Sequence, residues 1–298
     1  MAETYRKNMQ IKIITFENFH GRKKGSMGSS MIRGEWLCNH WPEANLYTQG
    51  SYADVMIYQK VYWKYHMQDF KGVKILDLCD PDWIDGVLKL KEISFLVDAI
   101  TTNTKETAEF VRNSVKNIPV VCIPDRIDLT QFPKDIKKHE KIAEDIVWFG
   151  YQNNANILLP PLLYSLAKKK LKLHVISDGE FRPLNDCGVE IIYSKYESDS
   201  AFFMIRQNDI VINPSMNIKK FRYKSNNKTL ISWALGLPVA ITMDELNRFM
   251  DPIERRKEIK KRQQEIKEKW DIKFSVEQYK NLIKQICEKK KICPEFIR

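Results

Sequence analysis

Residues 209–242 read DIVINPSMNIKKFRYKSNNKTLISWALGLPVAIT. The apolar run 209–213 predicts a buried strand, and the letters SNN further on are a start signal for a helix over 227–235. Gly236 predicts the end of that helix, and a second apolar strand follows at 239–242. The stretch therefore predicts a strand, loop, helix, strand unit, as found in α/β folds.

The loop of this unit is rich in cations. Its basic residues are Lys219, Lys220, Arg222 and Lys224. The loop leads into the amino end of a helix, where unpaired backbone N–H groups and the helix dipole favour an anion. The sequence therefore favours a ligand that carries phosphate over a neutral ligand.

The run KSNNKTLISWALGLPV resembles the donor-site segment of GT-B glycosyltransferases of the family 4, or group 1, type. These enzymes have two Rossmann-like domains and move a sugar from a nucleotide donor, and their segment reads N-K-x-x-E-x-x-A-x-G-x-P-V. Six positions match: Asn227, Lys228, Ala234, Gly236, Pro238 and Val239. Ile231 stands where the family has the glutamate that grips the donor ribose. The resemblance therefore predicts a donor site but leaves the ribose without its usual partner.

Size and charge set the broad class of the protein. At 298 residues the chain can hold one large domain or two medium domains. The net charge of +11 allows attraction to nucleic acid, anionic lipid or phosphorylated substrates, although the basic stretch 254–291 is also typical of solvated helices. No apolar run approaches the roughly 18 residues of a membrane span. The amino-terminal residues do not read as a secretory signal.

The six cysteines are scattered along the chain without a C-x-x-C pair. They are Cys38, Cys79, Cys122, Cys187, Cys287 and Cys293. This pattern favours reduced thiols over a disulfide framework or a zinc site. We therefore expect a cytoplasmic protein, located in the host cytoplasm if the chain is viral.

A glycine-rich segment follows the first predicted strand, 11–16. Its cations Arg22, Lys23, Lys24 and Arg33 would suit phosphate, and its glycines let backbone amides approach a ligand. The spacing is neither GxGxxG nor GxxxxGK[ST], which excludes a Rossmann dinucleotide site and a P-loop. The segment resembles the glycine-containing loop of GT-B amino-terminal domains. With a later aspartate, the acceptor-binding candidates are His20, Arg22, Lys23, Gly25, Ser26, Gly28 and Asp82.

Two carboxylates follow the predicted strand 74–78, in the sequence Cys-Asp-Pro-Asp-Trp. Carboxylates at the carboxyl end of a central strand occupy the crevice where open α/β sheets bind ligands, so Asp80 or Asp82 could act as a general base toward an acceptor hydroxyl. A turn and helix cap around Pro81 explain them equally well. Asp80 is the catalytic candidate because it adjoins the strand.

Strands alternate with helices along the whole chain, which predicts an α/β protein with parallel sheets. One such helix is expected over 104–114, with Asn103 as its N-cap in a capping box. The resemblance implies the GT-B fold, with two Rossmann-like domains facing across a cleft. The expected division is an acceptor domain (1–133), a polar linker (134–144), a nucleotide-sugar domain (145–274) and a carboxyl-terminal helix that packs back across the domains (275–298).

The donor-binding candidates lie at strand ends and at the donor helix of the second domain. They are Gly150, Gln152, Asp178, Asn213, Arg222, Lys224, Asn227 and Lys228. Lys228 is also a catalytic candidate, because a cation there would offset the charge that builds on the leaving diphosphate. We expect no metal site and no cofactor, since the nucleotide sugar is a co-substrate.

The leading functional hypothesis is a glycosyltransferase that uses a nucleotide-diphosphate sugar, with a UDP-sugar such as UDP-glucose favoured. One acceptor is double-stranded DNA with hydroxymethylated pyrimidines, and the alternative is surface polysaccharide or glycolipid. A non-catalytic nucleotide-binding or nucleic-acid-binding module is a hypothesis of a different class, favoured by Ile231. An epimerase on the same fold is a third. The sequence leaves retention or inversion of the sugar configuration open.

Overall fold

The computed structural model describes residues 9–23, 25, 28–183, 185–214 and 219–291, and the chain divides into two compact units. Unit 1 contains Met1–Asp128, Ile218–Ser225 and Asp271–Arg298, and unit 2 contains Leu129–Asn217 and Asn226–Trp270. The chain therefore passes between the units several times, and the segment Ile218–Ser225 belongs to the first unit although the sequence before and after it belongs to the second. Among the described residues, no helix is long and apolar enough to cross a bilayer.

Unit 1 is built on a six-stranded sheet in the order β2-β1-β3-β4-β5-β6, in which every pair is parallel. Its strands are β1 (Ile11–Thr15), β2 (Ala44–Leu46), β3 (Val55–Gln59), β4 (Val73–Leu78), β5 (Ala99–Thr102) and β6 (Val120–Cys122). Ile13 is in register with Leu46 on one side and Ile57 on the other. Because β2 and β3 flank β1, the chain reverses direction across the sheet at β1, and a ligand crevice is expected at its carboxyl end.

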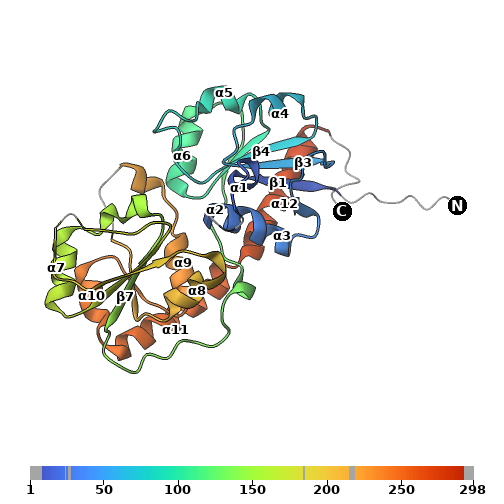
Figure 1. Ribbon diagram of the computed structural model, residues 1–298. Coiled ribbons are helices and arrows are strands. Elements are labelled where there is room, and N and C mark those ends of the chain that lie inside the picture. The colour runs from blue at the N-terminus through green and yellow to red at the C-terminus, as the bar shows by residue number, and fades with distance from the viewer. Residues whose placement is uncertain (1–8, 24, 26–27, 184, 215–218, 292–298) are drawn as a thin grey trace. The chain divides into compact units, whose positions relative to one another are not determined.

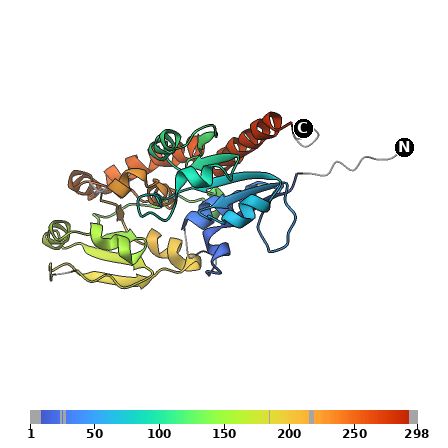
Figure 2. The same cartoon turned by 90° about the horizontal axis from the view of Figure 1, so that it is seen from above.

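Helices cover both faces of this sheet (Figure 1). The helices of unit 1 are α1 (Phe16–Phe19), α2 (Gly28–Ser30), the π-helix η1 (Met31–Glu35), α3 (Trp36–His40), α4 (Lys64–Asp69), α5 (Leu90–Ser94), α6 (Lys105–Ser114), the 3₁₀ helix η4 (Lys219–Tyr223) and α12 (Ile272–Lys289). Leu76 and Leu78 point into an apolar core shared with Ile93 and Val111 of α5 and α6. In both views α12 runs alongside the sheet (Figure 1 and Figure 2).

Unit 2 has a five-stranded parallel sheet in the order β11-β10-β7-β8-β9. Its strands are β7 (Asp145–Phe149), β8 (Lys172–Ser177), β9 (Ile191–Lys195), β10 (Ile210–Ile212) and β11 (Val239–Ala240). Its helices are η2 (Leu129–Gln131), η3 (Gln152–Ile157), α7 (Pro160–Lys168), α8 (Ser198–Arg206), α9 (Asn227–Ala234), α10 (Met243–Phe249) and α11 (Pro252–Lys269). The strand order reverses between β7 and β10. Two parallel sheets with helices confirm the predicted α/β class.

The glycine-rich segment is largely helical, which the sequence analysis did not predict. Ile32, Trp36 and Leu37 are each at most 3% exposed and provide the apolar face that holds η1 and α3 on the sheet. Gly34 is needed for this packing, because a Cβ atom there would overlap the side chain of Thr15. Helix α6 also starts one residue later than expected, since its N-cap is Thr104 rather than Asn103.

The segment 134–144, expected as a linker, packs within unit 2. His139 is 2% exposed, and its Nε2 lies 2.9 Å from the carbonyl oxygen of Gly236. Arg255 donates from Nε to His139 Nδ1 at 3.1 Å and also binds the carbonyl oxygens of Phe249 and Met250. A segment with few apolar residues is thus held by hydrogen bonds to buried polar groups, a form of packing that leaves no apolar pattern in the sequence.

Acid should destabilise unit 2 through His139. Burial lowers the pKa of His139 to about 4, and the neighbouring Arg255 contributes to this shift. Since the unfolded pKa is about 6.5, the neutral histidine stabilises the fold above pH 6.5, and this contribution is lost as the pH falls toward 4. We expect about 2 kcal/mol to be lost by pH 4.5, measured by urea unfolding. The variant His139→Gln should show a shallower pH dependence over this range, and equal slopes would contradict the assignment.

Candidate functional site

The carboxyl edge of the unit 2 sheet brings most of the predicted donor residues together. Gly150 follows β7 directly, Asn213 follows β10, and Asn227 and Lys228 begin α9. Because the strand order reverses between β7 and β10, these positions border the crevice where open α/β sheets bind ligands. These residues lie near one another because β7 and β10 are neighbours in the sheet and the chain runs from β10 to α9.

Lys228 lies beside the end of β7. Its Nζ is 4.5 Å from the ring centroid of Trp148 and 5.9 Å from that of Phe149. The indole of Trp148 is fully buried, so its face is a fixed support for the ammonium group. The sequence analysis did not identify Trp148, because a tryptophan within an apolar strand reads as core.

The loops after β7 and β8 are joined to each other. The backbone N–H of Gln152 donates to Asp178 Oδ1 at 2.7 Å, and the Gln152 side-chain amide donates to the carbonyl oxygen of Glu180 at 2.6 Å. Gly179 lies directly against the Gln152 side chain, where a Cβ atom would overlap it. Gln152 and Asp178 therefore form one polar edge.

Replacing Gly150 should displace Lys228. Gly150 has φ +148°, and a Cβ atom there would lie 2.5 Å from Lys228 Nζ. We expect Gly150→Ala to cost about 1–3 kcal/mol of stability, because the backbone conformation is strained for alanine. It should also weaken the UDP binding that the sequence analysis leads us to expect, measured by thermal shift, because the ammonium must move. Gly188→Ala is the control: Gly188 has φ +68°, but its added Cβ would meet only Ala167 at 3.9 Å. Equal UDP affinity in the two variants would contradict this role of Lys228.

A second polar cluster lies at the carboxyl edge of the unit 1 sheet. Lys60 follows β3 and donates to Asp80, after β4, at 2.6 Å, and Tyr62 donates to Asp82 at 2.6 Å. Both pairs join residues twenty positions apart, because β3 and β4 are neighbours. Lys60 has φ +54°, which is costly for a residue with a side chain and is found mainly where surrounding structure enforces it.

The two carboxylates of this cluster differ in environment. Burial raises the pKa of Asp82, while Lys60 and the hydroxyl of Tyr62 partly oppose that rise. Asp80 instead forms an ion pair with Lys60. Burial acts to lower the pKa of Lys60, but the nearby acidic groups Cys79, Asp80 and Asp82 outweigh it, so the pKa is raised. Asp80 is thus occupied by a cation, whereas the hydrogen-bond partner of Asp82 is the neutral hydroxyl of Tyr62. Asp82, which the sequence offered as an acceptor contact and as the second choice for the general base, therefore suits that role better than Asp80.

The glycine-rich segment places its predicted acceptor residues near β1. His20 is exposed and lies 4.3 Å from the ring of Phe16, and Arg22 lies 5.1 Å from the same ring. The backbone N–H of Gly25 donates to Glu17 Oε2 at 3.2 Å. Lys23 is exposed and Gly28 begins α2, whereas Lys24 and Ser26 lie outside the described residues.

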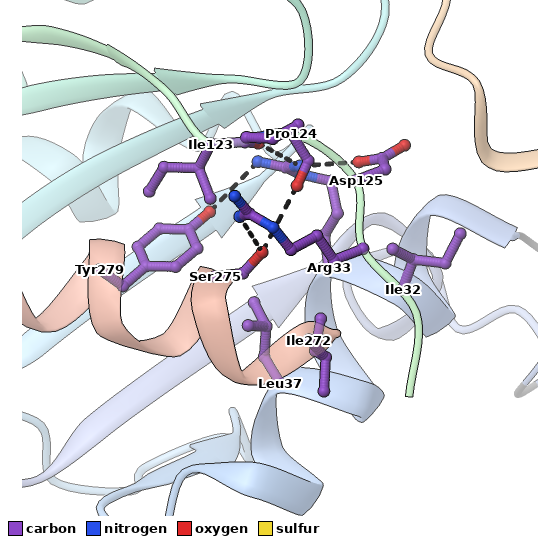
Figure 3. Close-up of a pocket in the computed structure, with 10 residues that line it drawn as sticks. Ile32, Arg33, Leu37, Ile123, Pro124, Asp125, Ile272, Ser275 and Tyr279 are labelled. Carbon is purple, nitrogen blue, oxygen red and sulfur yellow. Dashed lines mark hydrogen bonds and ion pairs between the residues drawn. The ribbon is translucent and has the colours of Figure 1, made fainter. Parts of the chain in front are cut away.

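Arg33 does not belong to a phosphate site, which corrects the expectation from its sequence context. Its guanidinium is 3% exposed and donates to Asp77 at 2.7 and 2.5 Å and to Asp125 at 2.7 Å. It also donates to the carbonyl oxygen of Ile123 at 2.9 Å and to the hydroxyl of Tyr279 at 3.3 Å (Figure 3). Burial disfavours the charge, but the acidic partners outweigh it, so the pKa of Arg33 is raised. The residue joins η1, β4 and α12.

Two predicted donor residues lie in unit 1 instead of unit 2. Arg222 and Lys224 belong to or adjoin η4, whose Tyr223 packs against Trp83 and Phe110. Lys220 of the same helix forms a 2.6 Å ion pair with Asp85. The structure thus assigns these cations to unit 1 and Lys228 to unit 2. Among the described residues, no group of three or more His, Cys, Asp or Glu side chains could hold a metal ion.

Comparison with known proteins gives structural matches but no sequence matches. No protein-family model matches the chain, and no curated protein matches it by sequence. An alpha-glucosyltransferase solved with UDP-glucose and DNA containing an abasic site superposes with a TM-score of 0.65 at 11% identity, covering 93% of this chain and 100% of that one. Sucrose-phosphate synthase from Thermosynechococcus elongatus gives 0.62 at 11% identity, covering 95% and 100%.

TarM gives a TM-score of 0.59 at 12% identity, and the match covers 77% of this chain. The chain spans only about half of the length of TarM, 54%. Identities this low carry information about the fold rather than about substrates. The two parallel sheets and these structural matches show that the chain has the GT-B fold and resembles the GT-B glycosyltransferases.

Proposed function

We propose that the protein transfers a sugar from a nucleotide-diphosphate sugar, with a UDP-sugar favoured, to an acceptor hydroxyl. The observation that carries this proposal is the Lys228 ammonium beside Gly150, at the point where the strand order of unit 2 reverses. Ligands of open α/β sheets bind at such points, and a glycine there lets phosphate approach the backbone. The GT-B fold and its neighbour solved with UDP-glucose support the same reading.

Lys228 would neutralise the negative charge that develops on the leaving diphosphate. Asn227 and the amino end of α9 would contact the same phosphates, since helix amino ends favour anions. The edge formed by Gln152 and Asp178 would hold the rest of the nucleotide. In this proposal the Lys228 ammonium performs the charge neutralisation for which other transferases use a metal ion. The apolar side chain of Ile231, which is 6% exposed, provides no polar contact to the ribose.

Asp82 would accept the proton of the acceptor hydroxyl if the reaction inverts the sugar configuration. We expect Asp82→Asn to lower kcat by about 10²–10⁴-fold with little change in the KM for the donor, because general-base catalysis contributes on that order. Asp80→Asn should have a smaller effect, since Asp80 is held by Lys60. Nucleotide release in the presence of acceptor measures both. An unchanged rate in Asp82→Asn would show that transfer needs no base at this position.

We further propose double-stranded DNA with hydroxymethylated pyrimidines as the acceptor. The net charge of +11 supports a polyanionic partner, and the neighbour solved with DNA supports this class. Binding to duplex DNA should weaken steeply as salt rises, because phosphate contacts release counterions. Salt-independent or absent binding would favour a surface polysaccharide or glycolipid acceptor.

Incubation with a panel of nucleotide sugars tests the enzyme directly. We expect release of nucleoside diphosphate from one donor, and a mass increase of one sugar per modified base in hydroxymethylated duplex but none in unmodified duplex. Release without transfer to DNA would reject the proposed acceptor alone. No release and no thermal shift with any nucleotide would reject the enzyme and favour a non-catalytic module.

A further inference from the structure

The basic segment, defined as residues 219–224, is anchored to unit 1. Tyr223 is 6% exposed, and its ring lies 5.5 Å from that of Trp83 and 5.8 Å from that of Phe110. The hydroxyl of Thr107, in α6, donates to the carbonyl oxygen of Tyr223 at 3.5 Å. These contacts fix the segment at the carboxyl edge of the unit 1 sheet, where β4 and β5 end.

The 3₁₀ geometry of η4 arranges the side chains of the segment in three rows. Residues three apart lie on the same side of a 3₁₀ helix. Lys220 and Tyr223 face unit 1, since Lys220 pairs with Asp85 and Tyr223 is buried. Lys219 and Arg222 share a second row, and both are exposed. The segment thus presents Lys219 and Arg222 to solvent in one row, while the Lys220–Asp85 ion pair and the buried Tyr223 hold it in place.

We propose that the basic segment binds the phosphodiester backbone of a nucleic-acid acceptor, and not the diphosphate of the donor. The inference rests on the proposed function and revises the role that the sequence suggested for Arg222. Exposed cations in a row on an anchored helix fit an extended polyanion, whose phosphates stay in water. A donor diphosphate is compact, and a cation for it already lies at the edge of unit 2, where Lys228 adjoins Gly150.

A second group of cations belongs to the same edge of unit 1. Arg22 and Lys23 follow β1, and both are exposed. Arg22 lies over the ring of Phe16, which restricts its position. The basic segment lies beyond the ends of β4 and β5, so the edge offers cations at separate positions along its length. Phosphate contacts of this kind position a protein on nucleic acid without reading its sequence.

The double variant Lys219→Ala/Arg222→Ala tests the proposal, with a short hydroxymethylated duplex as probe and fluorescence anisotropy as readout. The slope of log K against log salt should become shallower by about two, and affinity at low salt should fall at least tenfold. The donor KM should change less than twofold. Lys260→Ala/Lys261→Ala, which removes two exposed cations from α11 of unit 2, is the matched control and should leave duplex binding unchanged.

Three outcomes would overturn the proposal. If the double variant raises the donor KM and leaves duplex binding unchanged, Lys219 and Arg222 bind the donor and not the acceptor. Equal losses in the double variant and in the α11 control would show non-specific attraction only. Binding of the wild-type protein to vesicles of anionic lipid, but not to duplex, would identify a membrane partner instead. Failure of the proposed function gives a different result, because donor hydrolysis without acceptor does not depend on Lys219 or Arg222. If the wild-type protein hydrolyses no donor but binds duplex through the basic segment, the proposed enzyme is wrong and the proposed binding surface is still supported.

Discussion

Replacing Arg33 by methionine should destabilise unit 1 by about 3–5 kcal/mol, the range for removing one partner of a buried ion pair. The guanidinium, 3% exposed, is bound by two carboxylates, Asp77 at 0% and Asp125 at 2% exposure. Without it, both acidic groups remain buried with no cation between them, although Thr101 and Tyr279 still donate to Asp77. Urea unfolding followed by circular dichroism measures the loss.

Arg182→Met is the control for this prediction. Its side chain is 81% exposed and pairs with Glu180 at 2.7 Å, so its removal should change stability by less than about 0.5 kcal/mol. Adding Asp77→Asn to Arg33→Met should restore part of the loss, because one of the two stranded charges is then removed. A loss below about 1 kcal/mol in Arg33→Met would show that solvent reaches the carboxylates.

The strands were predictable because each is a short apolar run bounded by polar residues. β7, which precedes Gly150, is such a run, and the helix expected at 227–235 corresponds to α9 within one residue. The donor residues Gly150 and Lys228 could be found for the same reason, since they sit at the ends of these elements. Local sequence thus determines which residues reach the carboxyl edge of a sheet.

Pairings across strands were not predictable in the same way. Lys60 and Tyr62 meet Asp80 and Asp82 only because β3 and β4 are adjacent, which the sequence does not state. The helices at 28–40 have a signal in the helical spacing of Ile32, Trp36 and Leu37, but the glycines of that region favour a loop by local propensity. Residues 28–40 form helices because their apolar side chains pack on the sheet, and tertiary packing often overrides local propensity.

The location of the basic segment depended on a long-range contact. Its neighbours in sequence belong to unit 2, and its cations alone suggested a phosphate of the donor. The structure instead places the segment in unit 1, because Tyr223 is buried against Trp83 and Phe110. An aromatic residue among cations was the only sequence signal, and it identifies no partner by itself.

Replacing Lys228 by methionine should lower kcat/KM by about 10²–10³-fold, the range for removing one group that stabilises developing negative charge. Methionine keeps the unbranched stem and its packing on Trp148 but removes the ammonium, so the protein should stay folded. Most of the loss should appear in kcat, since charge on the diphosphate is greatest in the transition state. Steady-state rates of nucleotide release from the donor identified in the panel measure this.

Two further variants show whether charge or position matters at Lys228. Lys228→Arg keeps the charge, but the larger guanidinium must fit beside Gly150, where Nζ already leaves no room for a Cβ atom. We expect it to recover only part of the rate, whereas Lys261→Met, on the exposed face of α11, should retain all of it. If Lys228→Met instead raised KM with kcat unchanged, the ammonium would bind donor and transition state equally. Lys228 would then be a binding residue, and the charge on the leaving group would have to be offset by another part of the protein.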